Sequence, residues 1–142
     1  MAIKLQRIYS KDRQEGLRIL VDRLWPRGVS RESAQLHSWF RDVAPSNNLR
    51  IQFSHEAGRY ELFREIYLKE LTTNPTFQRL LDLCKNNDVV LLFSATDTEH
   101  NNAVVLKEAI EREMSRTHRF CDAYLSNSSS FRVLALRASG DS

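Results

Sequence analysis

The sequence predicts a layered α/β or α+β domain in which helices pack on a small mixed sheet. Residues 89–93 form an apolar run without alternation, which indicates a strand covered on both faces, as in a parallel sheet. Shorter apolar stretches near the N-terminus predict two more strands, and several later segments repeat their apolar residues at helical spacing. Strands and helices in such an order are typical of a single layered domain.

The first two strands are predicted at residues 3–9 and 17–21. Ile3 and Leu5 alternate with polar residues, which is the period of a half-buried strand. Residues 10–16 are polar and end in glycine, so they predict a turn. The two strands could therefore pair as a hairpin, although this turn is longer than the tight two-residue kind.

Helices are predicted between these strands and the buried strand. A short one is expected to end near Pro45, and its apolar residues have helical spacing: Leu36, Trp39, Phe40 and Val43. Residues 49–53 are ambiguous, and a helical turn is favoured. The clearest helix covers residues 56–71, with Ser54 as its expected N-cap and an aromatic stripe that we interpret as core. Another helix begins at the pair Asn74–Pro75, which suits the N-cap and first helical position.

The last helix is predicted at residues 99–113, and residues 1–113 are assigned to one α/β domain. Residues 114–142 differ, because the serine-rich stretch 126–130 has the composition of a linker. We expect this C-terminal extension to be partly disordered and dispensable for folding.

Composition limits the class of protein. The chain has 142 residues, of which 42% are hydrophobic and 27% are charged, as in a soluble globular domain. No apolar run approaches the roughly 20 residues of a membrane span. The N-terminus lacks the layout of a signal peptide, so we expect a cytoplasmic protein. Cys84 and Cys121 belong to no paired motif, which argues against a disulfide framework or a zinc ribbon.

The distribution of charge favours an anionic partner. The net charge is +3, but residues 1–55 hold twice as many basic as acidic residues. A basic half of the chain attracts anions. It nevertheless falls short of the dense basic stripe that is typical of a nucleic-acid-binding protein.

The turn after the second strand is the first candidate binding site. It places Arg23 and Arg27 on either side of Trp25, and a proline and a glycine bracket the second arginine in a defined turn. Two guanidinium groups held in this way could bind a phosphate or a carboxylate. The alternative is that Trp25 is core and that both arginines are neutralised within the protein, by Asp22 and Asp42.

The second candidate site, residues 97–101, follows the buried strand and opens the last helix. In open α/β sheets ligands bind beyond the carboxyl ends of the strands, and a helix N-terminus favours anions. Asp97 and His100 are a candidate general-base pair, and Asn101 is a candidate ligand-binding residue. The alternative is that Asp97 only caps the helix and that His100 is an exposed first-turn residue.

Other motifs add little. His55, just before the clearest helix, is a candidate third corner of the site or else a polar residue at a helix start. The sequence patterns of phosphate-binding loops, zinc proteases and nucleophile elbows are absent. The sequence therefore identifies no cofactor and predicts no metal site.

Four segments form a recognisable set: residues 22–28, 39–46, 53–55 and 97–103. In this order they resemble the YeaO-like family, a domain-of-unknown-function family numbered 488, and the resemblance covers about residues 3–113. It implies a small bacterial or archaeal α/β protein without a characterised activity. Asp42 and Ser46, in the second segment, are further candidate ligand-binding residues.

The sequence departs from the pattern of that family at three places. Ser54 stands where the family usually has glycine. Ala57 and Gly58 stand where it usually has Asp-Pro, so the clearest helix is expected to be less well capped. The segment after Met114 lies outside the pattern.

Three functions follow as hypotheses. The favoured one is the binding of a small phosphate- or carboxylate-bearing ligand, either as a binding protein or as an enzyme. The second is a nucleic-acid-binding protein, whose affinity would fall steeply with salt. The third is a regulatory or interaction protein in which the charged motifs only hold the fold, so that arginine variants would unfold. The oligomeric state is not predicted.

Overall fold

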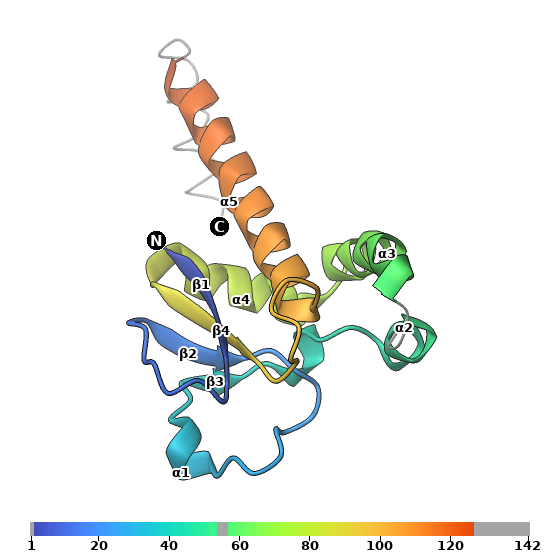
Figure 1. The fold of residues 1–142 in the computed structure, drawn as a ribbon. Coiled ribbons are helices and arrows are strands. Elements are labelled where there is room, and N and C mark those ends of the chain that lie inside the picture. The colour runs from blue at the N-terminus through green and yellow to red at the C-terminus, as the bar shows by residue number, and fades with distance from the viewer. Residues whose placement is uncertain (1, 54–56, 127–142) are drawn as a thin grey trace. The chain divides into compact units, whose positions relative to one another are not determined.

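The computed structural model describes residues 2–53 and 57–126, and Figure 1 shows the elements along the chain. The chain divides into two compact units, Met1–Glu111 and Arg112–Ser142. The first unit contains the sheet and the helices that position the candidate site. The described part of the second unit is the C-terminal portion of helix α5 (Asn102–Ser126).

The sheet has four strands in the order β1-β4-β2-β3, and all of them are parallel. Strand β4 (Val89–Phe93) lies between β1 (Ile3–Arg7) and β2 (Leu17–Leu20), and all five of its residues are buried. The α/β class and the buried strand are thus confirmed. The sheet is parallel instead of mixed, and the expected hairpin is absent from the described residues, because β4 separates β1 from β2. The remaining strand, β3 (Ser38–Trp39), pairs with β2 at one edge.

The connection from β1 to β2 runs back along the outer edge of β1, which lets both strands enter the sheet in the same direction. Gln14 Nε2 donates a hydrogen bond to the Leu5 carbonyl on that edge (3.2 Å). Gly16, just before β2, adopts a φ of +133° and lies beside the start of β4. A Cβ at this position would lie 2.8 Å from the carbonyl oxygen of Asp88. The backbones approach so closely that only glycine fits.

Two tryptophans cover one face of the sheet. Trp25 and Trp39 meet edge to face with ring centroids 5.4 Å apart, and both pack partly buried against a cluster that includes Leu20. The prediction of a short helix around Trp39 is wrong. The amide of Phe40 donates to the carbonyl of Leu20 (2.9 Å), so the segment extends the sheet as β3 before a 3-10 helix, η1 (Arg41–Val43).

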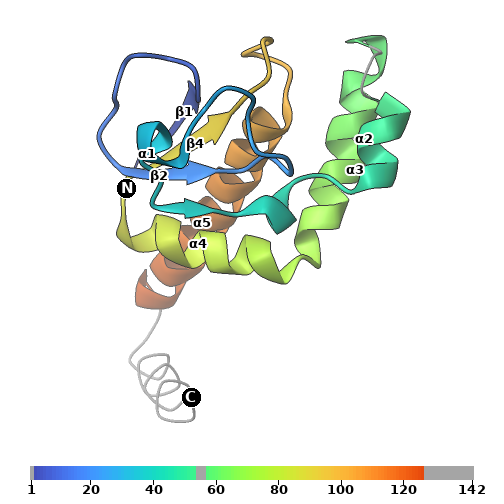
Figure 2. The ribbon, with the colours of Figure 1, turned by 90° about the horizontal axis from the view of Figure 1, so that it is seen from below.

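Helices cover both faces of the sheet. Helix α1 (Arg31–Ala34) lies on the face that carries the tryptophans, whereas α4 (Pro75–Asn86) and the first turns of α5 lie on the opposite face (Figure 2). The predicted start of α4 is confirmed, because the side-chain oxygen of Asn74 accepts hydrogen bonds from the amides of Thr76 (2.9 Å) and Phe77 (3.3 Å).

Two further helices form a wall beyond the sheet. They are α2 (Asn47–Phe53), where a helical turn was favoured, and α3 (Tyr60–Thr72), which follows a 3-10 turn, η2 (Ala57–Arg59). Regular α-helix thus begins later than residue 56. The expected N-cap, Ser54, lies outside the described residues.

The aromatic stripe of α3 divides between two environments. Tyr67 is fully buried, and its hydroxyl donates to the carbonyl of Val43 (2.6 Å). Burial raises the pKa of Tyr67, so the phenol stays neutral. Tyr60 and Phe63 are only partly buried. The interpretation of the stripe as core therefore holds for Tyr67 and Leu71 and not for the residues nearer the start of the helix.

Helix α5 continues past residue 113, where the sequence predicted its end. Neither glycine nor proline interrupts it, and its many charged residues are good helix formers. Apart from Ser126 the expected linker lies outside the described residues, and the dispensability of residues 114–142 stays a prediction. Over the described part of the chain, no helix is both long enough and apolar enough to cross a membrane.

Candidate functional site

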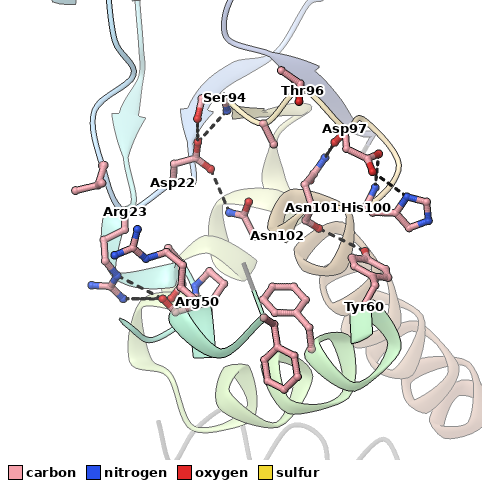
Figure 3. A pocket seen from close by; sticks show the side chains of 16 residues that line it. Asp22, Arg23, Arg50, Tyr60, Ser94, Thr96, Asp97, His100, Asn101 and Asn102 are labelled. Carbon is pink, nitrogen blue, oxygen red and sulfur yellow. Dashed lines mark hydrogen bonds and ion pairs between the residues drawn. The ribbon is translucent and has the colours of Figure 1, made fainter. Parts of the chain in front are cut away.

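A pocket with a volume of about 640 Å³ lies beyond the carboxyl ends of β2 and β4 (Figure 3). Its walls come from the residues that follow each of these strands, from α2 and α3, and from the start of α5. Ligands of open α/β sheets bind at this end of the strands. The two segments that the sequence singled out therefore meet in one place.

Asp22 connects the segments that line the pocket by hydrogen bonds. Its Oδ2 accepts hydrogen bonds from the amide and the hydroxyl of Ser94, each 2.8 Å long. Its Oδ1 accepts one from Nδ2 of Asn102 (3.2 Å). One carboxylate thus ties the end of β2 to the end of β4 and to the first residue of α5. Its acceptor positions are used by the protein itself.

Arg23 lines the pocket with its guanidinium partly fixed. Nε donates to the carbonyl of Pro45 (3.4 Å), and Nη2 donates to the carbonyls of Ala44 and Pro45 (both 3.3 Å). Within the described residues, Nη1 makes no hydrogen bond, and neither Asp22 nor Asp42 forms an ion pair with Arg23. The guanidinium is therefore oriented by neutral carbonyls and keeps its charge available.

Arg27 and Trp25 lie outside the pocket. The side chain of Arg27 is exposed, while its carbonyl accepts a hydrogen bond from the hydroxyl of Tyr9 (2.9 Å). Trp25 belongs to the packing on the sheet, and its Nε1 donates to the carbonyl of Val29 (2.6 Å). The expected pairing of Arg23 with Arg27 in one site is not what the structure shows.

The second arginine in the pocket is Arg50 of α2, which the sequence analysis did not select. Its side chain is exposed and makes no hydrogen bond or ion pair with any described residue. In Figure 3 Arg50 and Arg23 lie on the side of the pocket away from Asp97 and His100. The helical spacing of Arg50 and Phe53, both lining residues, is the one sequence signal that could have indicated it.

Asp42 and Ser46 do not line the pocket. Asp42 is exposed, and its carbonyl accepts from Nδ2 of Asn74 (2.9 Å). The amide and hydroxyl of Ser46 donate to the carboxylate of Glu70 (3.1 and 2.6 Å), and its Oγ accepts from the amide of Leu49 (3.2 Å). Ser46 therefore caps α2 and ties it to α3, so it positions the helix that carries Arg50.

Asp97 and His100 are in contact, as the general-base pair requires, with Oδ2 and Nδ1 3.1 Å apart. Asp97 also accepts from the amides of Glu99 (2.9 Å) and His100 (3.0 Å). These backbone hydrogen bonds, the first from Glu99, hold the pKa of Asp97 below its usual range. Both side chains are more than half exposed. The carboxylate closes a turn ahead of the helix.

Asn101 is the N-cap of α5. Its Oδ1 accepts from the amide of Val104 (3.0 Å), and its Nδ2 donates to the carbonyl of Asp97 (2.8 Å). Helix α5 therefore begins at Asn102 and not near Glu99. Asn101 lines the pocket, but both ends of its amide already have partners.

Three aromatic side chains, Phe53, Tyr60 and Phe63, complete the lining. Burial raises the pKa of Tyr60, and the charge of Glu108 adds to this, so its hydroxyl is neutral near pH 7. The neighbouring Arg64 donates from Nε to Glu108 of α5 (2.8 Å) and fixes the start of α3 beside that helix.

The remaining expectations concern His55 and a metal site. His55 lies outside the described residues. Within residues 2–53 and 57–126, no group of three or more histidine, cysteine or acidic side chains could hold a metal ion.

Comparison with known proteins identifies relatives over most of the chain. Residues 2–132 match a family model described as "Inactive DUF488-N3 subclade", so the match extends past Met114. "Uncharacterized protein YeaO" of Escherichia coli is 42% identical over 110 residues, which are 76% of this chain and 96% of that protein. "Uncharacterized protein Rv3073c" of Mycobacterium tuberculosis is 29% identical over 109 residues, which are 76% of this chain and 92% of that protein. No solved structure matches the chain.

Proposed function

Because this chain belongs to the DUF488 family, in a subclade described as inactive, we propose that it binds a small phosphate- or carboxylate-bearing ligand without transforming it. One observation carries the proposal. Arg23 and Arg50 line the same pocket, and both keep guanidinium nitrogens that no described residue occupies. The ligand would bind at the carboxyl end of the sheet, where open α/β folds bind their ligands.

The hydrogen-bonding capacity of the pocket supports an anion. The carboxylates of Asp22 and Asp97 accept hydrogen bonds from side chains and amides of the protein itself. Guanidinium groups remain, and they form strong, often bidentate hydrogen bonds with carboxylates and phosphates. Arg23 is already oriented by two carbonyls, so little conformational entropy is lost when it meets an anion.

The proposal assigns no proton transfer to Asp97 and His100. Their contact matches the geometry of a general-base pair, but the same carboxylate closes the turn that leads into α5. A lowered pKa makes Asp97 a weaker base than an ordinary aspartate. The contacts of Asp97 and His100 are therefore explained by a structural role in this turn, without catalysis.

Isothermal titration calorimetry on the full chain tests the proposal. The panel contains inorganic phosphate, sugar phosphates, nucleotides and organic acids at up to millimolar concentration. We expect Arg50→Ala to weaken binding of the best anion about tenfold or more, because a charge-assisted hydrogen bond contributes about 1.5–3 kcal/mol. Arg79→Ala removes an exposed arginine of α4 away from the pocket and is the matched control. No heat from any member of the panel would reject the proposal.

Nucleic-acid binding remains the alternative, and one observation favours it. Two exposed arginines stack on the tryptophan face, Arg31 over Trp25 (4.7 Å) and Arg41 over Trp39 (5.4 Å). Stacked guanidiniums present their N–H groups outward, where phosphates could meet them. A gel shift that weakens steeply between 50 and about 200 mM salt would support this alternative. Binding that is absent at low salt would exclude it.

A further inference from the structure

The inference rests on the proposed function and concerns the kind of anion that the pocket accepts. Beside the two arginines, the pocket is lined by the aromatic rings of Phe53, Tyr60 and Phe63. None of the three is fully buried, in contrast to Tyr67 further along α3. Apolar rings that stay partly accessible inside a concave site are the usual lining for the apolar part of a ligand.

Contacts within the protein hold this aromatic wall in place. The rings of Tyr60 and Phe63 stack with centroids 6.0 Å apart and 30° between their planes. His100 meets Tyr60 edge to face at 4.9 Å, and Arg64 anchors the same part of α3 to Glu108. A wall ordered in advance loses little entropy when a ligand covers it.

The two arginines and the ring of Tyr60 occupy different parts of the pocket. In Figure 3 the arginines lie on one side, and Tyr60 lies across the pocket from them, below Asp97 and His100. An inorganic anion bound to the arginines would leave the ring of Tyr60 uncovered. A pocket of about 640 Å³ has room for a larger organic molecule that reaches both.

From this juxtaposition we propose that the ligand is an aromatic anion, a planar ring that carries a phosphate or a carboxylate group. The anionic group meets Arg23 and Arg50, and the ring packs against Phe53, Tyr60 and Phe63. Aromatic side chains prefer a planar aromatic partner to a saturated ring of similar size, because their quadrupoles favour offset-stacked and edge-to-face pairs.

Calorimetry of the full chain with matched probes tests the inference. Phenyl phosphate and cyclohexyl phosphate carry the same anionic group on a planar and on a saturated ring, and inorganic phosphate carries no ring. Benzoate and cyclohexanecarboxylate repeat the comparison for carboxylates. We expect the aromatic member of at least one pair to bind about three- to tenfold more tightly than its saturated partner. Inorganic phosphate should bind more weakly than phenyl phosphate.

The variant Phe63→Leu keeps an apolar side chain and removes the ring. It should bring phenyl and cyclohexyl phosphate close to equal affinity and leave the affinity for inorganic phosphate unchanged. Circular dichroism checks that the variant folds, and Phe53→Leu on α2 provides the same test if it does not.

The outcomes separate the inference from the proposed function. Measurable binding of anions with equal affinity for the aromatic and saturated members of both pairs would overturn the inference and leave the proposed function intact. No heat from any of the five probes would overturn the inference, and no heat from the wider panel of anions as well would reject the proposed function.

Discussion

The two ends of strand β2 differ in how the chain is held. At the amino end, Gly16 lies against the backbone of Asp88, and the Leu17 amide donates to the same residue's carbonyl (2.8 Å), so backbone meets backbone. At the carboxyl end, side chains make the connections, because Asp22 ties β2 to Ser94 and Asn102. Close backbone packing leaves no cavity, whereas side chains that bridge a gap leave room for a pocket. Substitutions at the two ends test this difference.

The largest effect is expected at the amino end. Gly16→Ala places a Cβ 2.8 Å from a backbone oxygen that cannot move aside, at a φ that side chains rarely adopt. We expect the free energy of unfolding in urea to fall by about 3 kcal/mol. Gly28→Ala is the matched control, since Gly28 also has a positive φ (+72°) but no atom near its Cβ position, and about 1 kcal/mol is expected there. Equal losses would show that the contact with Asp88 is unimportant.

At the carboxyl end, Asp22→Ala removes three hydrogen bonds at once. The amide and hydroxyl of Ser94 lose their acceptor, and Nδ2 of Asn102 keeps only the carbonyl of Val21. We expect a loss of about 2–3 kcal/mol in the free energy of unfolding, measured by urea titration. Asp42→Ala removes an exposed carboxylate and should change stability by less than about 0.5 kcal/mol. A neutral result for Asp22→Ala would contradict the role of Asp22 as a tie between elements.

A smaller effect is expected where α3 meets η1. Tyr67→Phe removes the hydrogen bond to the Val43 carbonyl and should lower stability at pH 7 by about 1–2 kcal/mol. Burial raises the pKa of Tyr67 above its unfolded value of about 10, so the stability that the neutral phenol contributes is present below pH 10 and is lost as the pH rises further. Wild type should therefore lose stability above pH 10 more steeply than the variant. Parallel curves between pH 9 and about 11 would contradict the neutral buried phenol.

The smallest effect is expected at Arg27. Its side chain is exposed, and within the described residues it has no ion pair with Asp22 or Asp42. Arg27→Ala should change the free energy of unfolding by less than about 0.5 kcal/mol. A loss above about 3 kcal/mol would point to a buried ion pair instead.

The sequence predicted the elements whose pattern is local. The apolar run at β4 reports burial on both faces of a strand, and Asn74 with Pro75 reports a helix start, because each signal lies within a few residues. Strand β3 was missed because two residues are too few to show a period of two, and the apolar spacing around Trp39 also fits a helix.

Some of the candidate site residues line the pocket and others do not. Parallel strands bring the segments after β2 and β4 to one end of the sheet, so Arg23 and Asp97, which the sequence placed in two separate candidate sites, line one pocket. Arg50 reaches the same pocket through the packing of α2, which depends on the capping of that helix by Ser46 and its tie to Glu70. In the sequence, the helical spacing of Arg50 and Phe53 is the one trace of this tertiary contact.

The connection between β1 and β2 also affects whether a second chain can pair with the edge of the sheet. An edge strand with unpaired backbone groups is a template on which a second chain can add, which leads to aggregation. Gln14 occupies the outward-facing carbonyl of Leu5 on one edge. The other edge is the two-residue strand β3, which offers too short a ladder for an added strand. One edge of the sheet is covered by the β1–β2 connection, and the other edge strand has only two residues. We therefore expect little aggregation through edge-to-edge strand pairing at high protein concentration.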